Sequence, residues 1–375
     1  MQFLKTKKST NIPQEEKYFV ATPRQLMWWK FKKHKLAVIS LFILGLMYFL
    51  AAFAEFISPY NIHVRHIRHL YAPPQKIHFV YNGKFHLRPA VYKMRFKIHP
   101  VTLREIYYED PEEVYPIKLL CQGEKYTFWG LFETDIHLLG VKEGGTFFLL
   151  GTDRMGRDML SRTICGSRIS LSIGLIGVSL SLIFGLILGG LSGYLGGVTD
   201  IVIQRIIEVL RSFPAIPLWL GLSAALPMTW SPLRVYFAIT VILSLLGWTG
   251  VARAARGKLL ALREEDFAMA AYLAGANKWR IIYKHLLPSF LSHIIVTVTL
   301  RIPGMILGET ALSYLGLGLR PPITSWGVLL KECQNLQDVA HHPWLLLPVL
   351  FIILTILSFN FIGDGLRDAA DPYAT

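Results

Sequence analysis

Charged residues are scarce in this chain of 375 residues, because Asp, Glu, Lys and Arg together make up only 17% of it. Soluble globular proteins average about 25% charged residues. Hydrophobic residues reach 53%, and the mean hydropathy is +0.41. This composition excludes an ordinary soluble enzyme, and it excludes intrinsic disorder, which requires low hydrophobicity. It indicates apolar membrane segments joined to a smaller polar part.

Cysteine is also rare, with three residues in the whole chain. Their odd number excludes a complete disulfide framework, and their spacing fits no metal site. A bridge between Cys121 and Cys333 stays open, since both lie outside the predicted membrane spans. The chain has no Walker A, GxSxG or HExxH motif, and His341-His342 is more typical of a membrane edge than of a metal site. We therefore expect no catalytic site, metal or cofactor in this chain.

Positive charge dominates, with 39 basic residues against 25 acidic ones and a net charge of +14. Residues 1–35 alone hold nine basic and two acidic residues. The apolar run 36–57 follows, and as a helix it would reach about 33 Å, enough to cross a bilayer core of about 30 Å. The run is too long for a signal peptide or an ordinary core helix. Its basic flank predicts a cytoplasmic N-terminus.

Five further apolar runs predict five more membrane helices. They cover residues 169–197, 206–226, 236–252, 290–312 and 344–362. The run 206–226 contains Glu208, Pro214 and Pro217, so we expect it to be broken or partly interfacial. The run 169–197 is rich in small residues that favour close helix packing in lipid, namely Gly174, Gly177, Gly185, Gly189 and Gly193. Six spans place both termini in the cytoplasm.

The predicted cytoplasmic loop 253–289 joins the fourth and fifth spans. It holds seven basic and three acidic residues, in agreement with the positive-inside rule. Its pattern predicts a helix over about 258–276, a break at Asn277 and a second short helix before Pro288. Ala268, Ala271 and Gly275 would share one face of the first helix. A partner protein could grip that narrow face, or the chain could pack against it itself, and the spacing leaves both open.

Most of the polar part is segment 58–150, which lies between the first two spans and holds 12 basic and nine acidic residues. Alternating β-branched and aromatic residues, with a turn signal at Asn82-Gly83, predict a small mixed or β-rich extracytoplasmic domain. The other boundaries follow from the spans. Residues 1–35 form a cytoplasmic basic segment, 151–363 the remaining helical core, and 364–375 a cytoplasmic tail.

Two charged residues, Arg301 and Glu309, fall within the fifth predicted span. Charges at membrane depth are costly and usually face the bundle interior or a water-filled cavity. Eight residues of helix separate these two by about 12 Å, so we expect each to have another partner. We predict that they line a pathway or an interface with a partner subunit. The alternative for Glu309 is a place at the outer membrane boundary.

Four segments of the chain resemble, in the same order, a known family. Ala270-Ala271, Gly275, His285 and Leu287-Pro288 resemble the EAA loop of binding-protein-dependent ABC importer permeases, with Met269 in place of the motif's Glu. Segments 151–162, 309–327 and 360–372 resemble the dipeptide, oligopeptide and nickel group of these permeases, and within it the second permease type. The likeness covers residues 151–375 and the first span, whereas segment 58–150 departs from the shorter members.

The resemblance implies an all-α membrane protein with the six transmembrane helices of a type I ABC importer permease and a small extracytoplasmic insert. It also implies a paralogous permease as partner, an extracytoplasmic solute-binding protein, and two cytoplasmic ATPase subunits that bind ATP and Mg. The loop 253–289 would dock in the ATPases. The docking residues would be Glu265, Asp266, Ala270, Ala271, Gly275, His285, Leu287 and Pro288.

The function implied by the resemblance is import of di- or oligopeptides across a bacterial or archaeal plasma membrane. Oligosaccharides or nickel are alternatives for the same machinery. Nickel would favour a path lined by His or carboxylates, and the predicted spans hold little of either. A secondary transporter or a membrane receptor without ATPase partners is an alternative of another class, but it leaves the loop 253–289 unexplained.

Overall fold

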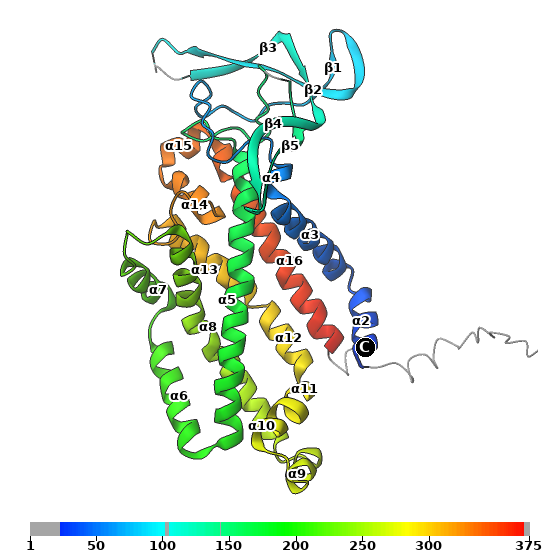
Figure 1. Cartoon of the computed structure of the whole chain (residues 1–375), viewed down its shortest axis with the longest axis vertical. Helices are drawn as coiled ribbons and strands as arrows, with labels where there is room; N and C mark the ends of the chain where they lie inside the picture. The colour runs from blue at the N-terminus through cyan, green and yellow to red at the C-terminus, as the bar shows by residue number, and fades with distance from the viewer. Residues whose placement is uncertain (1–22, 102–104, 143, 371–375) are drawn as a thin grey trace, which may run out of the picture.

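The chain folds into a bundle of long helices with β strands at one end, as the computed structural model in Figure 1 shows. The structure describes residues 23–101, 105–142 and 144–370. We call the end next to the strands the insert end and the opposite end the loop end. The basic residues before residue 23 and the tail after residue 370 lie outside the described residues.

Among the described residues, five helical segments are long and apolar enough to cross a membrane, and a bent pair brings the number to six if it counts as one span. The five contain α3 (Lys35–Ala52), α5 (Met159–Leu195), α8 (Pro232–Leu262), α12 (Leu291–Thr299) with α13 (Ile302–Tyr314), and α16 (Leu347–Ala370). The bent pair is α6 (Gly197–Ser212) and α7 (Ala215–Ala224), which meet at 86°. Pro214 lies at this bend, so the predicted break within 206–226 is confirmed.

Short elements connect the spans. They are α2 (Pro23–Lys33), α4 (Ala54–Ile57), α14 (Trp326–Leu330), the 3-10 helix η2 (Lys331–Gln334), α15 (Leu336–His341) and the 3-10 helix η3 (Pro343–Leu346). The loop end carries α9 (Asp266–Leu273), α10 (Lys278–Arg280), the π-helix η1 (Ile281–Leu286) and α11 (Leu287–Ser289).

Several helices differ from the prediction in length. α5 begins at Met159 rather than at residue 169, and α8 continues to Leu262 rather than to residue 252. An apolar run marks only the part of a helix that lies in lipid, so the polar ends were missed. At the start of α5 the Asp158 carboxylate accepts a hydrogen bond of 2.7 Å from the backbone of Ser161, which caps the helix. α16 likewise continues to Ala370, into the segment predicted to be a tail.

Two predicted helices are interrupted. The prediction of a continuous helix over 258–276 is wrong, because α8 ends at Leu262 and α9 begins at Asp266. Acidic residues at 264–266 favour a new helix start, since the N-terminus of a helix carries partial positive charge. The fifth span also breaks, between α12 and α13, where Arg301 precedes the second helix and Pro303 lies in its first turn.

The glycines of α5 allow it to pack backbone to backbone against α8. A side-chain carbon built on Gly189 would lie 2.5 Å from the Ala252 carbonyl oxygen, and one on Gly193 would lie 2.9 Å from the Arg256 carbonyl oxygen. Side chains larger than glycine would therefore force the helices apart. The predicted role of the small residues in close packing is confirmed, and α5 and α8 form the centre of the bundle.

The insert is built from strands, as predicted. The strands β1 (His78–Tyr81), β2 (Lys84–Ile98) and β3 (Glu105–Pro116) form an antiparallel sheet, and β4 (Lys118–Phe128) pairs with β5 (Phe132–Gly140) as a hairpin. The predicted turn at Asn82-Gly83 joins β1 to β2, and both residues have positive φ, at 53° and 72°. Val91, Ile117 and Phe147 form a small buried core.

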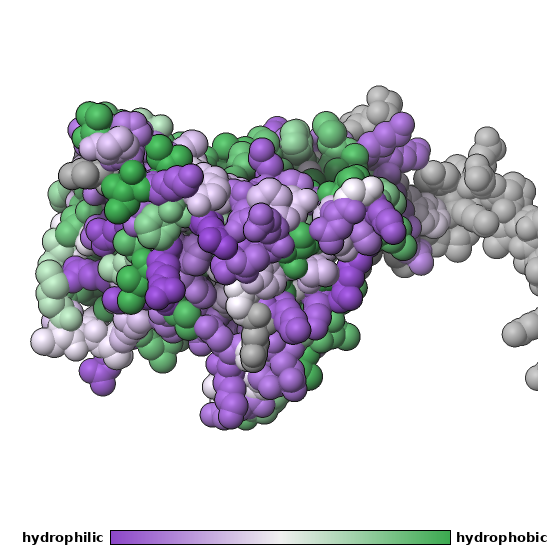
Figure 2. All heavy atoms as spheres, turned by 90° about the horizontal axis from the view of Figure 1, so that it is seen from above, coloured by the Kyte–Doolittle hydropathy of each residue, from purple (hydrophilic) through white to green (hydrophobic). Residues whose placement is uncertain are grey.

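Hydrophilic side chains cover the centre of the insert end when it is viewed from above, and hydrophobic ones gather at its margins (Figure 2). This distribution suits a face that meets water. Cys121, Cys165 and Cys333 all belong to the described residues and are free thiols, so the bridge that the sequence left open between Cys121 and Cys333 does not form. Burial raises the pKa of the Cys121 thiol, which keeps it protonated.

Candidate functional site

The hairpin at the loop end is shaped by a turn that requires glycine. After α9 the Gly275 backbone N–H donates to Tyr272 O at 2.9 Å, and the Ala276 N–H donates to Ala271 O at 3.1 Å. This pair of bonds is the Schellman pattern, and it places Gly275 at a φ of +80°. Asn277 then starts the next helix by accepting a hydrogen bond of 2.7 Å from the Arg280 N–H. The predicted break at Asn277 is therefore confirmed.

Ala268 and Ala271 lie on the inner side of α9. Ala268 is buried against Ile281 and Leu286 of the same hairpin, and Ala271 packs on the edge of this cluster. Of the two interpretations that the spacing left open, the structure supports packing within the chain for Ala268. Among the other predicted docking residues, His285 and Leu287 are half-buried, whereas Glu265, Asp266, Ala270, Gly275 and Pro288 are exposed.

Large apolar side chains form the outer side of the same hairpin. Leu273 is 80% exposed and Tyr272 60%, and the rings of Trp279 and Tyr283 stack with 5.7 Å between centroids. Phe267 and Met269, which also belong to α9, are exposed as well. We call these six residues the hairpin face. The hairpin face was not predicted, because the family motif marks the small residues of this loop, although its many aromatic residues could have indicated an exposed apolar face.

Glu309 in α13 lies fully buried in the bundle. Its carboxylate accepts three hydroxyl hydrogen bonds, from Ser170 at 3.2 Å, Ser313 at 2.8 Å and Ser325 at 2.6 Å. Ser170 lies in α5, Ser313 lies in α13 itself, and Ser325 is the residue that precedes α14. One buried acidic group thus joins three elements, which no local pattern in the sequence could have indicated.

Each of the three serine oxygens also accepts a backbone hydrogen bond from the segment that follows α13. Ser313 accepts from Leu319 N at 3.0 Å, Ser170 from Trp326 N at 3.1 Å and Ser325 from Val328 N at 3.2 Å. Glu309 therefore fixes the path of residues 315–330 through its serines. Within the segment 309–327, this contact pattern gives Glu309, Ser313, Ser325 and Trp326 a shared structural role.

Arg301 lies at the break between α12 and α13 and reaches across to α8. Its Nη1 donates to the Gly247 carbonyl oxygen at 3.3 Å, and a side chain on Gly250 would collide with the guanidinium. Gly250 thus makes room for the arginine, and Gly247 supplies the acceptor. Arg301 Nε is buried without a hydrogen-bond partner among the described residues. Arg301 and Glu309 bond to different groups, as their spacing predicted.

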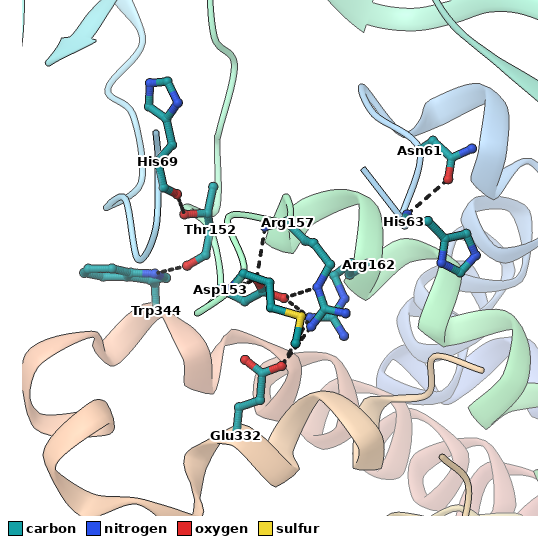
Figure 3. A network of polar contacts seen from close by, with 10 residues as sticks. Asn61, His63, His69, Thr152, Asp153, Arg157, Arg162, Glu332 and Trp344 are labelled. Atoms are coloured by element: carbon teal, nitrogen blue, oxygen red, sulfur yellow. Dashed lines mark hydrogen bonds and ion pairs between the residues drawn. The ribbon is translucent and has the colours of Figure 1, made fainter. Parts of the chain in front are cut away.

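A network of ion pairs lies at the insert end, around the loop that precedes α5 (Figure 3). Asp153 accepts a hydrogen bond of 2.7 Å from Arg157 Nε and also bonds Arg162. Glu332 accepts from Arg157 Nη2 at 3.0 Å. Burial raises the pKa of the Glu332 carboxyl, and the carboxylate of Asp153 nearby acts in the same direction. The motif at 151–162 is therefore an electrostatic link between α5 and η2.

The same loop holds the start of the insert against the bundle. Thr152 Oγ1 donates to His69 O at 2.6 Å, and the Trp344 indole N–H donates to Thr152 O at 3.0 Å. Gly156 has a φ of +70°, and a side chain there would collide with the His66 carbonyl. Beside this loop is a cavity of about 490 Å³, within the usual size range of ligand pockets. Among the described residues, its walls include Arg65, Arg154, Arg157, Arg162 and Lys331 but only two carboxylates, those of Glu332 and Asp338.

A bundle of membrane spans with a polar cavity at one end and an exposed apolar hairpin at the other defines a multi-pass membrane transport subunit. Residues 181–374 match the family described as "Binding-protein-dependent transport system inner membrane component". Residues 22–74 match "N-terminal TM domain of oligopeptide transport permease C". The chain belongs to the family of binding-protein-dependent transport permeases, the inner-membrane components of ABC importers.

Three relatives show how far the likeness extends. The oligopeptide permease OppC of Haemophilus influenzae is 43% identical over 244 residues, which are 64% of this chain and 75% of the relative. The glutathione permease GsiD of Pectobacterium atrosepticum is 40% identical over 60% of this chain and 72% of its own. The dipeptide permease DppC of Lactococcus lactis is 30% identical over 350 residues, or 93% of this chain and 90% of its own. That last match extends across most of segment 58–150.

Proposed function

We propose that this chain forms, with a paralogous permease, the membrane path of an ATP-driven importer for peptides. An extracytoplasmic solute-binding protein delivers the peptide, and two cytoplasmic ATPase subunits bind the ATP and Mg. The relatives are named for oligopeptide, dipeptide and glutathione transport, and all of these solutes carry carboxylates. The excess of arginine and lysine around the cavity at the insert end suits a carboxylate and repels a divalent cation such as nickel.

The proposed orientation places the insert end outside and the loop end in the cytoplasm. The basic helix α2 and the hairpin with α9 lie at the same end of the bundle, opposite the strands (Figure 1). Both are rich in Lys and Arg, which supports a cytoplasmic location for that end. In this orientation both termini are cytoplasmic, and segment 58–150 faces the binding protein.

The observation that carries the proposal is the hairpin face. Exposing large apolar side chains to water costs free energy. An apolar patch on a polar loop at the end of α8 therefore suits contact with another protein. The predicted docking residues Glu265, Asp266 and Gly275 lie on the same hairpin. Closure of the ATPase subunits would push on α9, and α8 would carry the displacement into the membrane as a rigid-body motion.

The experiment replaces one residue at the centre of the hairpin face. Leu273→Asp should abolish co-purification of the ATPase subunits and peptide import into proteoliposomes, because a charge replaces an exposed apolar contact. The matched control is Leu336→Asp on α15, which is 83% exposed at the insert end. The control should keep both properties. Normal ATPase binding by Leu273→Asp would overturn the assignment of this face.

A second measurement separates the solutes and the classes of transporter. Proteoliposomes with the complete importer should take up a labelled tripeptide and not radioactive nickel or a labelled oligosaccharide. Uptake should stop when ATP is replaced by a non-hydrolysable analogue. Uptake driven by an ion gradient without ATPase subunits would instead identify a secondary transporter.

A further inference from the structure

The β4–β5 hairpin reaches from the insert to the side of the bundle, where it meets the ends of two spans (Figure 1). At its turn, the Trp129 indole N–H donates to the carbonyl oxygen of Ala52, the last residue of α3, at 2.9 Å. The guanidinium of Arg168 on α5 lies over the Trp129 ring at 4.3 Å from its centroid. The turn is therefore tied to both helices at one level of the bundle.

That level is the edge of the apolar part of the bundle. Arg168 pairs with Glu55 through two hydrogen bonds, one of them 2.6 Å long, and both side chains are partly exposed. An exposed ion pair is costly in hydrocarbon, so the pair favours a hydrocarbon edge below its level. The uncharged run of α5 begins directly after Arg168, and α3 ends at Ala52. These features favour a boundary between hydrocarbon and headgroups at the level of Trp129.

An apolar surface continues from α3 onto the hairpin. On α3, Phe49 is exposed, and its ring lies 4.8 Å from that of Phe53. The Phe53 ring lies 6.1 Å from Phe128, at the end of β4. Phe128 in turn contacts Phe132 of β5 at 5.4 Å. These aromatic rings join the membrane-facing surface of a span to the tip of the insert.

The tip itself is unusual for a turn in water. Trp129 has a φ of +51° and Gly130 a φ of +71°, and Leu131 N donates to Phe128 O at 2.9 Å, which defines a type I′ turn. Such turns favour Asn, Asp or Gly at the first central position, and a bulky residue is strained there. Leu131 is 80% exposed and Phe132 56%. Apolar residues at a strained, exposed turn point to an apolar environment.

We propose that the β4–β5 turn is a membrane anchor whose Trp129, Leu131 and Phe132 enter the lipid leaflet at the insert end. Trp129 lies at the headgroup level, where amphipathic rings are enriched, and Leu131 and Phe132 contact acyl chains. The phospholipid bilayer is the partner because the apolar surface of the turn is continuous with that of α3. The anchor fixes the insert against the bundle while the spans move.

The test measures whether the turn touches lipid in the assembled importer. Leu131→Cys is labelled with a fluorophore in a chain whose three native cysteines are serine, and the complex is placed in phosphatidylcholine–phosphatidylglycerol nanodiscs. Two control positions are Phe85→Cys, at the far end of the insert and 71% exposed, and Leu119→Cys, at the other end of β4 and 70% exposed. Quenching by lipids with a nitroxide on the acyl chain is compared with quenching by aqueous iodide.

The label at residue 131 should be quenched severalfold more by the nitroxide lipids than the labels at 85 and 119, and less by iodide. Equal iodide quenching at all three positions would place the turn in water and overturn the proposal. Protection of residue 131 from both quenchers would show that another protein, such as the paired permease, covers the turn, and this result would also overturn it.

Discussion

Replacing Glu309 with leucine tests whether this one buried carboxylate organises the segment that follows α13. Leucine has a similar size but offers no acceptor to Ser170, Ser313 and Ser325, which donate to the carboxylate at 2.6–3.2 Å. A buried hydroxyl that loses its acceptor costs about 1–3 kcal/mol. Three such groups together cost at least about 3 kcal/mol, which is large for a single substitution.

Two assays report the effect of Glu309→Leu, one global and one local. The thermal midpoint of the chain in nanodiscs should fall by several degrees. Hydrogen exchange should accelerate in residues 315–330, because the serine oxygens that accept from Leu319, Trp326 and Val328 lose their anchor. Exchange in the contact between α5 and α8 should stay unchanged, which distinguishes local release from general unfolding.

Two further variants calibrate the Glu309 result. Glu309→Gln keeps the oxygen that accepts from both Ser313 and Ser325, so its effect should be smaller than that of leucine. Glu208→Leu on α6 is the control, because Glu208 is exposed and pairs with Arg205, and exposed pairs contribute about 0–1 kcal/mol. If Glu309→Leu kept the wild-type thermal midpoint and the wild-type hydrogen-exchange rates, the reasoning would be refuted. The three serines would then hold the segment in place without the carboxylate.

Two other predictions concern the two ends of α5. Burial raises the pKa of Asp158 to about 6, so the folded chain binds this proton more tightly than the unfolded chain and stability falls as pH rises from about 4 to 6. Asp158→Asn keeps an N-cap but has no carboxyl group to titrate, so its thermal midpoint should fall less between about pH 4 and pH 6 than that of the wild type. An equal fall in both proteins would contradict the raised pKa of Asp158. Gly189→Val should prevent a stable bundle, because its side chain meets the Ala252 backbone, whereas Gly257→Ala, which meets nothing within 4 Å, should purify normally; size-exclusion profiles distinguish them.

The spans could be predicted from the sequence because lipid demands long apolar runs, and the packing of Gly189 followed from the same physics. The contacts of Glu309 could not be predicted from the sequence, since Ser170 lies 139 residues away and only the fold brings it close. On the hairpin, spacing placed Ala268 and Ala271 on one face but could not say which way that face points. For the insert, alternation predicted strands, but the contact between Trp129 and α3 depends on tertiary packing.

Because of the close backbone contact between α5 and α8, the two helices form one rigid unit. With 37 residues α5 is about 55 Å long, and with 31 residues α8 is about 46 Å long. Because the glycines lock them together, a push on the hairpin at one end must tilt both helices as a unit. If the pivot lies near the middle, the two ends swing in opposite directions by similar amounts. A single tilt would then narrow the opening at one side of the membrane as it widens the other.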